Sequence, residues 1–194
     1  MATYDPATAL LVVDVQNDFA SPQGSLSVRS AEAIIPVLNA EVDAAVSSDA
    51  PVVFTQDWHP EATPHFAKDG GIWPVHCVRE TWGAELHPAL DARGPVVRKG
   101  TGGEDGYSGF SVRDPVTGDR RATELDGLLR ARGVARLVIA GLATDYCVRE
   151  TALDARRLGY ATAVITDAVR AVDLEQGDGE RALADMREAG VELI

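Results

Sequence analysis

A chain of 194 residues, of which 45% are hydrophobic and 25% charged, is long enough for one domain with a full core and too short for two. This composition excludes disordered, fibrous and disulfide-dense proteins, and the formal net charge of −12 argues against nucleic acid or an anionic membrane as a partner, because both would repel the protein. We therefore expect residues 1–194 to form a single domain that folds alone or as a homo-oligomer.

The first residues, MATYDPATALLVVDVQ, do not follow the pattern of a signal peptide, because Asp5 and Asp14 stand where a basic start and a small-residue cleavage site are expected. No stretch approaches the 18 apolar residues of a membrane-spanning helix. We expect a cytoplasmic protein, whose two cysteines, Cys77 and Cys147, are free thiols in a reducing compartment.

The first predicted element, ALLVVDVQ (9–16), is a short continuous apolar run, which is typical of a strand buried on both faces. Apolar residues at i, i+3 and i+4 predict an amphipathic helix over 31–49, with Pro36 in its first turns. PVVFTQDW (51–58) is a second buried strand, and a long irregular stretch leads to a third short strand, GPVVRKG (94–100). Loops of that length in compact domains are usually functional.

A second long loop covers 101–122 and is followed by a helix that ends at Gly133. The remaining predicted elements are a strand at 135–141, a helix at 147–159, a strand at 161–168, a helix at 179–190 and a short strand at 191–194. The strands alternate with helices, and none shows the apolar/polar alternation of a half-exposed sheet. The sequence therefore predicts a doubly wound α/β fold, with a mostly parallel sheet and helices on both faces.

Reactive side chains stand at the carboxyl ends of the predicted strands, where the ligand crevice of an open α/β sheet lies. The first strand delivers Asp14, the third delivers Lys99, and the fourth leads through a tight turn to Cys147 at the start of a helix. The helix dipole and a nearby cation would favour the thiolate, and backbone N–H groups there would stabilise an oxyanion. Each residue alone is more often a packing thiol or a surface charge, but their shared position favours a catalytic set.

A second cluster follows the second strand, in DWHPEATPHF and WPVHC. Asp57 and His59 are two residues apart at a strand end, so both side chains lie on one face, and His65 and His76 follow in the loop. Together they form an oxygen and nitrogen ligand set suited to Zn, Mn or Fe. We expect one divalent transition metal ion here, with zinc as the first choice.

Three neighbouring features carry less weight. Cys77 could add a thiolate ligand beside His76, but a packing role is favoured, and His87 has no such company and is interpreted as structural. The glycine-rich GTGGEDGYSGF (100–110) lacks the ending of a phosphate-binding loop. Its glycines would instead let the backbone cross closely over the site, with Tyr107 and Phe110 offering ring faces.

Five motifs, LLVVDVQNDF, TQDWHP, WPVHC, RKGTGGEDGYSGF and GLATDYCVRETALDA, together resemble the isochorismatase-like cysteine hydrolases, and most closely the nicotinamidases, also called pyrazinamidases. The resemblance runs from residue 9 to about 170 and implies a Rossmann-like, six-stranded sheet. It implies that Asp14, Lys99 and Cys147 are the catalytic triad, that Asp57, His59 and His76 are metal ligands, and that His65 matches a further ligand of some members.

The resemblance also implies the surroundings of the triad. Family members carry a cis peptide before the alanine of GLATDYC, here Leu142 to Ala143, and use the amides of Ala143 and Cys147 as the oxyanion hole. Tyr146, just before the cysteine, is a variable position that decides little. Aromatic positions that line the ring pocket in the family are matched by Phe19, Trp73 and Tyr107.

The implied reaction is hydrolysis of a small aromatic amide, nicotinamide, to nicotinate and ammonia through a cysteine thioester, with pyrazinamide as a further substrate and NAD salvage as the setting. The implied metal holds the pyridine nitrogen of the substrate. Two alternatives within the superfamily are weaker, since isochorismatases proper lack the cysteine and carbamoyl-amide hydrolases generally lack the metal cluster. A catalytically idle binding protein on this fold would be expected to have lost one of these residues, and none is missing.

Overall fold

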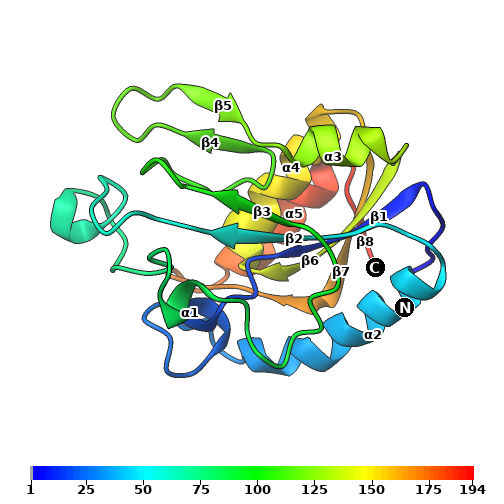
Figure 1. The fold of residues 1–194 in the computed structure, drawn as a ribbon, viewed down its shortest axis with the longest axis horizontal. Coiled ribbons are helices and arrows are strands. Elements are labelled where there is room, and N and C mark those ends of the chain that lie inside the picture. Colours follow the sequence, from blue (N-terminus) through cyan, green and yellow to red (C-terminus); the bar gives the residue numbers. More distant parts are fainter. Residues whose placement is uncertain (1) are drawn as a thin grey trace.

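The structure is a computed structural model that describes residues 2–194. Its fold is built around one six-stranded sheet, with the strand order β3-β2-β1-β6-β7-β8 (Figure 1). Every neighbouring pair in this sheet is parallel. Its strands are β1 (Thr8–Val13), β2 (Val52–Asp57), β3 (Val96–Lys99), β6 (Arg136–Leu142), β7 (Ala161–Arg170) and β8 (Glu192–Leu193).

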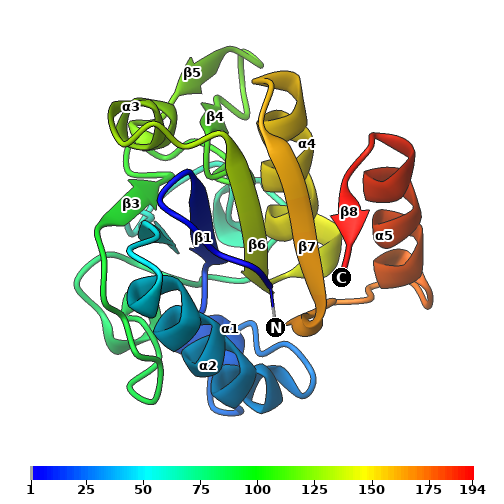
Figure 2. The same ribbon diagram turned by 90° about the vertical axis from the view of Figure 1, so that its right-hand side faces the viewer.

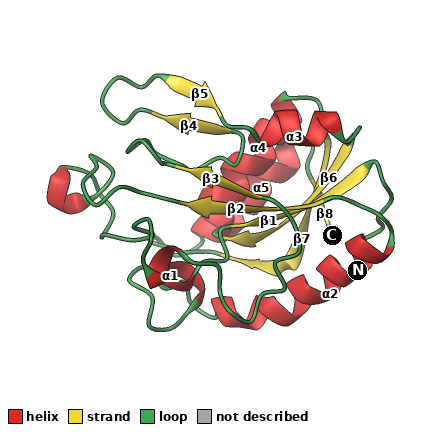
Figure 3. Cartoon of the chain, in the orientation of Figure 1, coloured by secondary structure: helices red, strands yellow, loops and turns green. Residues whose placement is uncertain are grey.

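Helices cover both faces of the sheet (Figures 2 and 3). All six residues of β1 are buried, and alternate side chains point to opposite faces: Leu10 packs in the cluster that contains the apolar side of α2, and Leu11 packs with α3, α4 and α5. The predicted doubly wound α/β fold is confirmed. The helices are α1 (Asn17–Ala20), α2 (Ile35–Ser47), α3 (Leu125–Ala131), α4 (Arg149–Arg157) and α5 (Asp178–Glu188).

The predicted helix over 31–49 is observed as a 3₁₀ turn, Ala31–Ile34, followed by α2. Pro36 lies in the first turn of α2, where its missing N–H needs no partner in the helix. The buried residues Leu38, Val42 and Ala45 recur at the predicted spacing and seal one face of the sheet.

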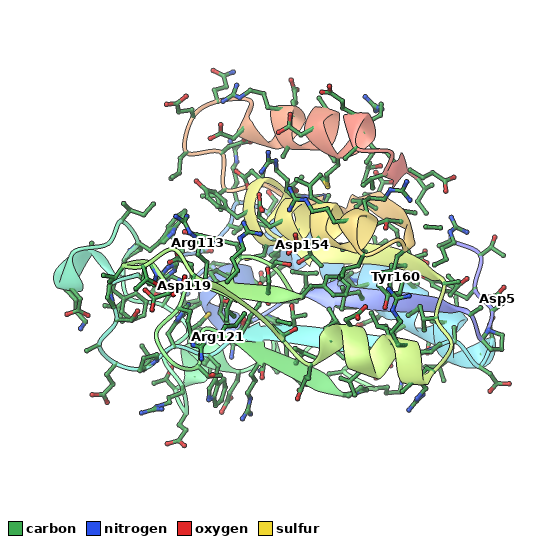
Figure 4. The ribbon with its side chains drawn as sticks, turned by 90° about the horizontal axis from the view of Figure 1, so that it is seen from above. Asp5, Arg113, Asp119, Arg121, Asp154 and Tyr160 are labelled. Atoms are coloured by element: carbon green, nitrogen blue, oxygen red, sulfur yellow. The ribbon has the colours of Figure 1, made fainter. Side chains whose placement is uncertain are left out.

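The predicted loop 101–122 contains a β-hairpin that the sequence did not reveal. Its strands, β4 (Ser111–Arg113) and β5 (Arg120–Ala122), form a separate two-stranded antiparallel sheet. Each strand has only three residues and is not buried, so no alternating apolar pattern in the sequence indicates it. Ser111 Oγ donates a hydrogen bond of 2.8 Å to Asp154 Oδ2 of α4, and Figure 4 shows Asp154 and the hairpin residues Arg113 and Arg121.

Two further boundaries differ from the prediction. The helix expected over 147–159 starts with a π-helical turn, Thr144–Val148, before α4 begins at Arg149. The strand predicted over 161–168 is β7, which continues to Arg170. The π-helical turn closes hydrogen bonds one residue further along than an α-helix does, a difference that hydrophobic periodicity does not reveal.

A glycine allows β6 to approach β1 closely at the edge where the site lies. Gly141 has φ +118°, and a Cβ atom there would lie 2.1 Å from the carbonyl oxygen of Val13. The chain can therefore turn directly after β6 beside the end of β1. Because β3, β2, β1 and β6 are neighbours in the sheet, their carboxyl ends meet at one edge, and the segment after β2 extends beyond the β2 and β3 arrowheads there (Figure 1).

Within residues 2–194, none of the helices combines the length and the apolar character needed to cross a membrane.

Candidate active site

Three side chains from three strand ends meet around the ammonium of Lys99. Its Nζ lies 2.7 Å from Oδ2 of Asp14 and 3.7 Å from Sγ of Cys147. All three residues are buried, with Cys147 the most accessible at 7% exposure. The structure thus brings together the carboxylate, the cation and the thiol that the sequence placed at separate strand ends.

The two carboxylate oxygens of Asp14 differ, since one accepts a hydrogen bond and the other does not. Thr55 Oγ1 donates a hydrogen bond of 2.6 Å to Oδ1, whereas Oδ2 accepts no well-aligned hydrogen bond even though it lies close to Lys99. Asp14 also has φ +50°, a strained conformation for a residue with a side chain. Burial raises the pKa of Asp14 to about 6, against the opposing effect of Lys99, so this carboxyl can accept and return a proton near neutral pH.

Lys99 is held by a second carboxylate and a carbonyl. Nζ donates to Asp57 Oδ1 at 2.5 Å and to the carbonyl oxygen of Gly106. Burial alone would lower the pKa of Lys99, but Asp14 and Asp57 raise it well above its ordinary value, so the side chain is a fixed cation. Ligand atoms of Asp14, Asp57 and Cys147 lie within 4.8 Å of one another. Because the ammonium contacts all three, we interpret this group as a proton-transfer site and not as a metal site.

Cys147 lies within the π-helical turn, two residues before α4 begins. The carbonyl oxygen of Ala143 accepts hydrogen bonds from the amides of Tyr146 (3.1 Å) and Val148 (3.0 Å), and the Leu142–Ala143 peptide is cis, as the resemblance implies. Burial raises the pKa of the Cys147 thiol well above its ordinary value, with Lys99 opposing and Asp14 reinforcing the change. The expectation that its position favours the thiolate is therefore wrong for the resting site, because burial outweighs the cation. Cys147 needs a base, and Asp14 is beside it.

Three buried histidines form a second cluster in the long segment after β2. One ring nitrogen from each of His59, His65 and His76 lies within 4.8 Å of the others. Both ring nitrogens of His59 are buried and have no hydrogen-bond partner among the described residues, which is unfavourable unless another group binds them. Burial lowers the pKa of His59 to about 4 and also lowers the pKa of His76, so these imidazoles are neutral, the form that binds metals. These features fit a transition metal ion.

Asp57, the predicted carboxylate ligand, lies between the histidine cluster and Lys99. Its Oδ1 is hydrogen-bonded to Lys99, and its Oδ2 lies 3.9 Å from His59 Nε2. Although burial disfavours the charged form, Lys99 holds the pKa of Asp57 below its ordinary value. This carboxylate is thus ionised, with one oxygen directed to the cation and one available to the cluster.

A cavity connects Cys147 with the histidine cluster. Two of its aromatic walls are tied together, because Trp73 Nε1 donates a hydrogen bond of 2.7 Å to the hydroxyl of Tyr107. Cys147 and two of the histidines, His65 and His76, all line this cavity, so a small flat ligand in it could contact the thiol and the histidines. The lining comprises Phe19, Leu26, Asp57, His65, Trp73, His76, Tyr107, Ala143, Tyr146, Cys147 and Val172.

Three of these lining residues, Leu26, Tyr146 and Val172, were not predicted. The ring of Tyr146 meets that of Trp73 edge to face at a centroid distance of 4.9 Å. Its place immediately before the nucleophile was an available signal, although the family resemblance gave it little weight. Leu26 and Val172 carry no chemical signature, and only the path of the chain places them at the cavity.

Cys77 and His87 lie outside the candidate site, as the sequence suggested. Cys77 is a free, buried thiol whose Sγ lies 3.9 Å from the carbonyl oxygen of Gly83, and Cys147 is also free. His87 Nε2 lies 3.4 Å from Glu32 Oε1, on the α2 side of the fold. Neither residue contributes to the histidine cluster.

Residues 8–194 match the isochorismatase domain family. The chain is 38% identical over 206 residues to a nicotinamidase of Escherichia coli, covering 97% of this chain and 94% of that relative. A pyrazinamidase of Pyrococcus horikoshii in complex with zinc matches with TM-score 0.87 and 39% identity, covering 97% of this chain and 99% of that one. PnC1 from L. infantum in complex with nicotinate matches with TM-score 0.90 and 35% identity, covering 100% of this chain and 95% of that one. The likeness in both sequence and fold thus extends over nearly the whole chain.

Proposed function

The chain belongs to the isochorismatase domain family, and from that premise we propose that it is a metal-dependent nicotinamidase, which hydrolyses nicotinamide to nicotinate and ammonia. One observation carries the proposal: a single cavity is lined by Cys147, whose sulfur lies 3.7 Å from the Lys99 ammonium paired with Asp14, and by His65 and His76 of the histidine cluster. Nicotinamide has its carboxamide and its ring nitrogen at different edges of one flat ring. The nicotinamidase from E. coli and the nicotinate complex of the L. infantum protein support this assignment.

In the first half of the reaction, Asp14 takes the thiol proton as Cys147 Sγ attacks the carboxamide carbon. Lys99 stays protonated and stabilises the Asp14 carboxylate and the developing thiolate. The amides of Ala143 and Cys147 would donate hydrogen bonds to the oxyanion of the tetrahedral intermediate. Asp14 returns the proton to the leaving nitrogen, the C–N bond breaks, and ammonia departs from a thioester on Cys147.

In the second half, Asp14 removes a proton from a water molecule that attacks the thioester carbon. The same amides stabilise the second oxyanion. Asp14 then donates its proton to the sulfur of Cys147 as the C–S bond breaks, and the nicotinic acid formed loses its own proton to solvent and leaves as nicotinate. The pKa of Asp14, about 6, suits a group that must accept and donate a proton in one cycle at neutral pH.

The metal would be held by His59, His65 and His76, with Asp57 supplying a carboxylate oxygen. A metal ion bound there would act as a Lewis acid toward the pyridine nitrogen of the substrate, which would orient the carboxamide toward the thiol. Zinc is the first choice because imidazole and carboxylate ligands suit it and because the P. horikoshii pyrazinamidase is a zinc complex, with Mn or Fe as alternatives. Phe19, Trp73 and Tyr107 would bind the faces and edges of the ring.

The biological setting belongs to the same proposal. We propose that the chain is a single domain that acts in the cytoplasm, alone or as a homo-oligomer, in the salvage of nicotinamide for NAD. Pyrazinamide, which has a flat ring of the same size with a carboxamide and a ring nitrogen meta to it, is expected to be a second substrate.

The test is ammonia release from nicotinamide by the purified, metal-loaded protein, beside Cys147→Ala and a chelator-treated sample. Both changes should abolish release, and mass spectrometry of a rapidly quenched wild-type reaction should detect the acylated Cys147. If the metal-loaded protein leaves nicotinamide intact but hydrolyses a carbamoyl amide, the reaction type stands and the substrate is wrong. If neither amide is hydrolysed with Zn, Mn or Fe, the catalytic assignment fails.

A further inference from the structure

A carboxylate outside the described triad and ligand set is bound to one histidine of the cluster. Oδ1 of Asp105 lies 2.6 Å from Nδ1 of His65. The side chain of His65 is 4% exposed and that of Asp105 is 15% exposed, so solvent competes weakly for this hydrogen bond. A carboxylate accepts hydrogen bonds only, so Nδ1 of His65 carries the hydrogen and Nε2 has the free lone pair.

The backbone holds both partners in place. The amide of Asp105 donates to the carbonyl oxygen of Arg113 at 2.8 Å, and the amide of Arg113 donates to the carbonyl oxygen of Asp105 at 2.9 Å, which ties Asp105 to β4 (Arg113 is labelled in Figure 4). On the other side, Thr63 Oγ1 accepts from the amide of His65 at 3.1 Å and donates to the carbonyl oxygen of Gly103 at 2.6 Å. The segments that carry His65 and Asp105 are therefore fastened to each other twice.

The other two histidines show what this contact adds. His76 Nδ1 lies 2.7 Å from the carbonyl oxygen of Pro74, which orients that ring by a neutral acceptor. His59 has no partner at either nitrogen among the described residues. Among the three, only His65 has a carboxylate oxygen within hydrogen-bond distance of a ring nitrogen, since the carboxylate oxygen of Asp57 lies 3.9 Å from Nε2 of His59. A carboxylate behind a ligating histidine fixes its tautomer and makes it a stronger electron donor.

We propose that Asp105 is a positioning residue of the metal site: it holds His65 as the tautomer with a free Nε2 directed to the cluster and places a negative charge behind that ligand. This proposal rests on the metal site of the proposed function. It also gives the hairpin a role, since β4 fixes Asp105, and it explains why His65, which lies in a loop, can have a defined orientation.

The first experiment measures metal affinity. Zinc dissociation constants of the stripped wild-type, Asp105→Asn and Glu104→Gln proteins are determined by competition with a chromophoric chelator. Asp105→Asn should weaken zinc binding about 10- to 100-fold. Glu104→Gln is the matched control, because it removes the same charge one residue away in a side chain that contacts Arg121 and the amide of Gly102, and its affinity should stay within about threefold of wild type. Equal affinities for all three proteins would overturn the proposal.

A second measurement reads the orientation itself and does not need metal or activity. Long-range ¹H–¹⁵N spectra of the metal-free protein should show His65 as the Nδ1–H tautomer in wild type and a mixed or reversed tautomer in Asp105→Ala. An unchanged tautomer in a folded Asp105→Ala protein would contradict the positioning role. If wild type binds none of Zn, Mn and Fe yet shows the expected tautomers, the metal requirement of the proposed function fails while the role of Asp105 in orienting His65 stands.

Discussion

The ammonium of Lys99 lies 2.7 Å from Oδ2 of Asp14, and neither side chain is accessible to solvent. Lys99 also binds Asp57, so one cation compensates two buried carboxylates. A buried pair of this kind adds little net stability over an apolar pair, but removal of one partner leaves a charge without compensation. The catalytic arrangement is thus also a structural requirement.

Lys99→Met should abolish amide hydrolysis and lower the free energy of unfolding by about 3–5 kcal/mol, because Asp14 and Asp57 would remain buried without their cation. Urea unfolding measures the change. The Asp14→Asn/Lys99→Met double variant should be less destabilised than the sum of the two single variants, since only Asp57, and no longer Asp14, would be left as a buried carboxylate without its cation. A Lys99→Met protein as stable as wild type would show that the buried carboxylates are compensated in another way.

The pH dependence of kcat/KM should report Asp14. Its carboxylate form is the base, and burial raises its pKa to about 6, so kcat/KM should fall about tenfold per pH unit as the pH drops below 6. The pKa values of Cys147 and Lys99 are both raised well above their ordinary values, and the pKa of His59 is lowered to about 4, so these groups do not titrate near pH 6. The measurement is kcat/KM between pH 4.5 and 8, with circular dichroism at each pH to confirm that the protein stays folded. A kcat/KM that stays constant down to pH 4.5 would exclude Asp14 as the base.

Metal removal should affect substrates according to their ring nitrogen. Chelation should sharply lower kcat/KM for nicotinamide, whereas kcat/KM for benzamide, which has no ring nitrogen and is expected to react slowly, should change little. An equal loss with both amides would mean that the metal acts on the reacting carbonyl or on the fold. The metal should also stabilise the protein, by about 2.7 kcal/mol at a free concentration of 100 Kd, because it binds the folded chain and not the unfolded one. Calorimetry with and without zinc measures this effect.

Two glycine variants should have opposite effects on stability. Gly141→Ala should lower the free energy of unfolding by about 1–3 kcal/mol or more, because φ is +118° and the new Cβ would lie 2.1 Å from the carbonyl oxygen of Val13. Gly127→Ala, in α3 with nothing within 4 Å of the added Cβ, should raise it by about 0.5–1 kcal/mol. Thermal unfolding compares the two, and a neutral Gly141→Ala would show that β6 can move away from β1.

The strand order of the fold was not predictable from periodicity, but its elements were. Continuous apolar runs such as 9–16 and 51–58 mark strands buried on both faces, and the i, i+3, i+4 pattern marks α2, because burial of a regular element leaves a local, repeating trace. The β4–β5 hairpin left no such trace, since its strands are short and are not buried. Its position depends on contacts with Asp105 and Asp154, which lie at other points of the chain.

By itself, the sequence determined which chemical groups stand at the strand ends: Asp14, Lys99 and Cys147, together with a run of histidines after β2. Only the tertiary structure decided how burial sets their protonation, with a neutral thiol and a carboxyl that titrates near 6, because desolvation depends on everything packed around a group. It also decided that Asp105 meets His65 across 40 residues of chain. A hydrogen bond between two loops is set by the path of the backbone in space, and that path is absent from any local pattern of residues.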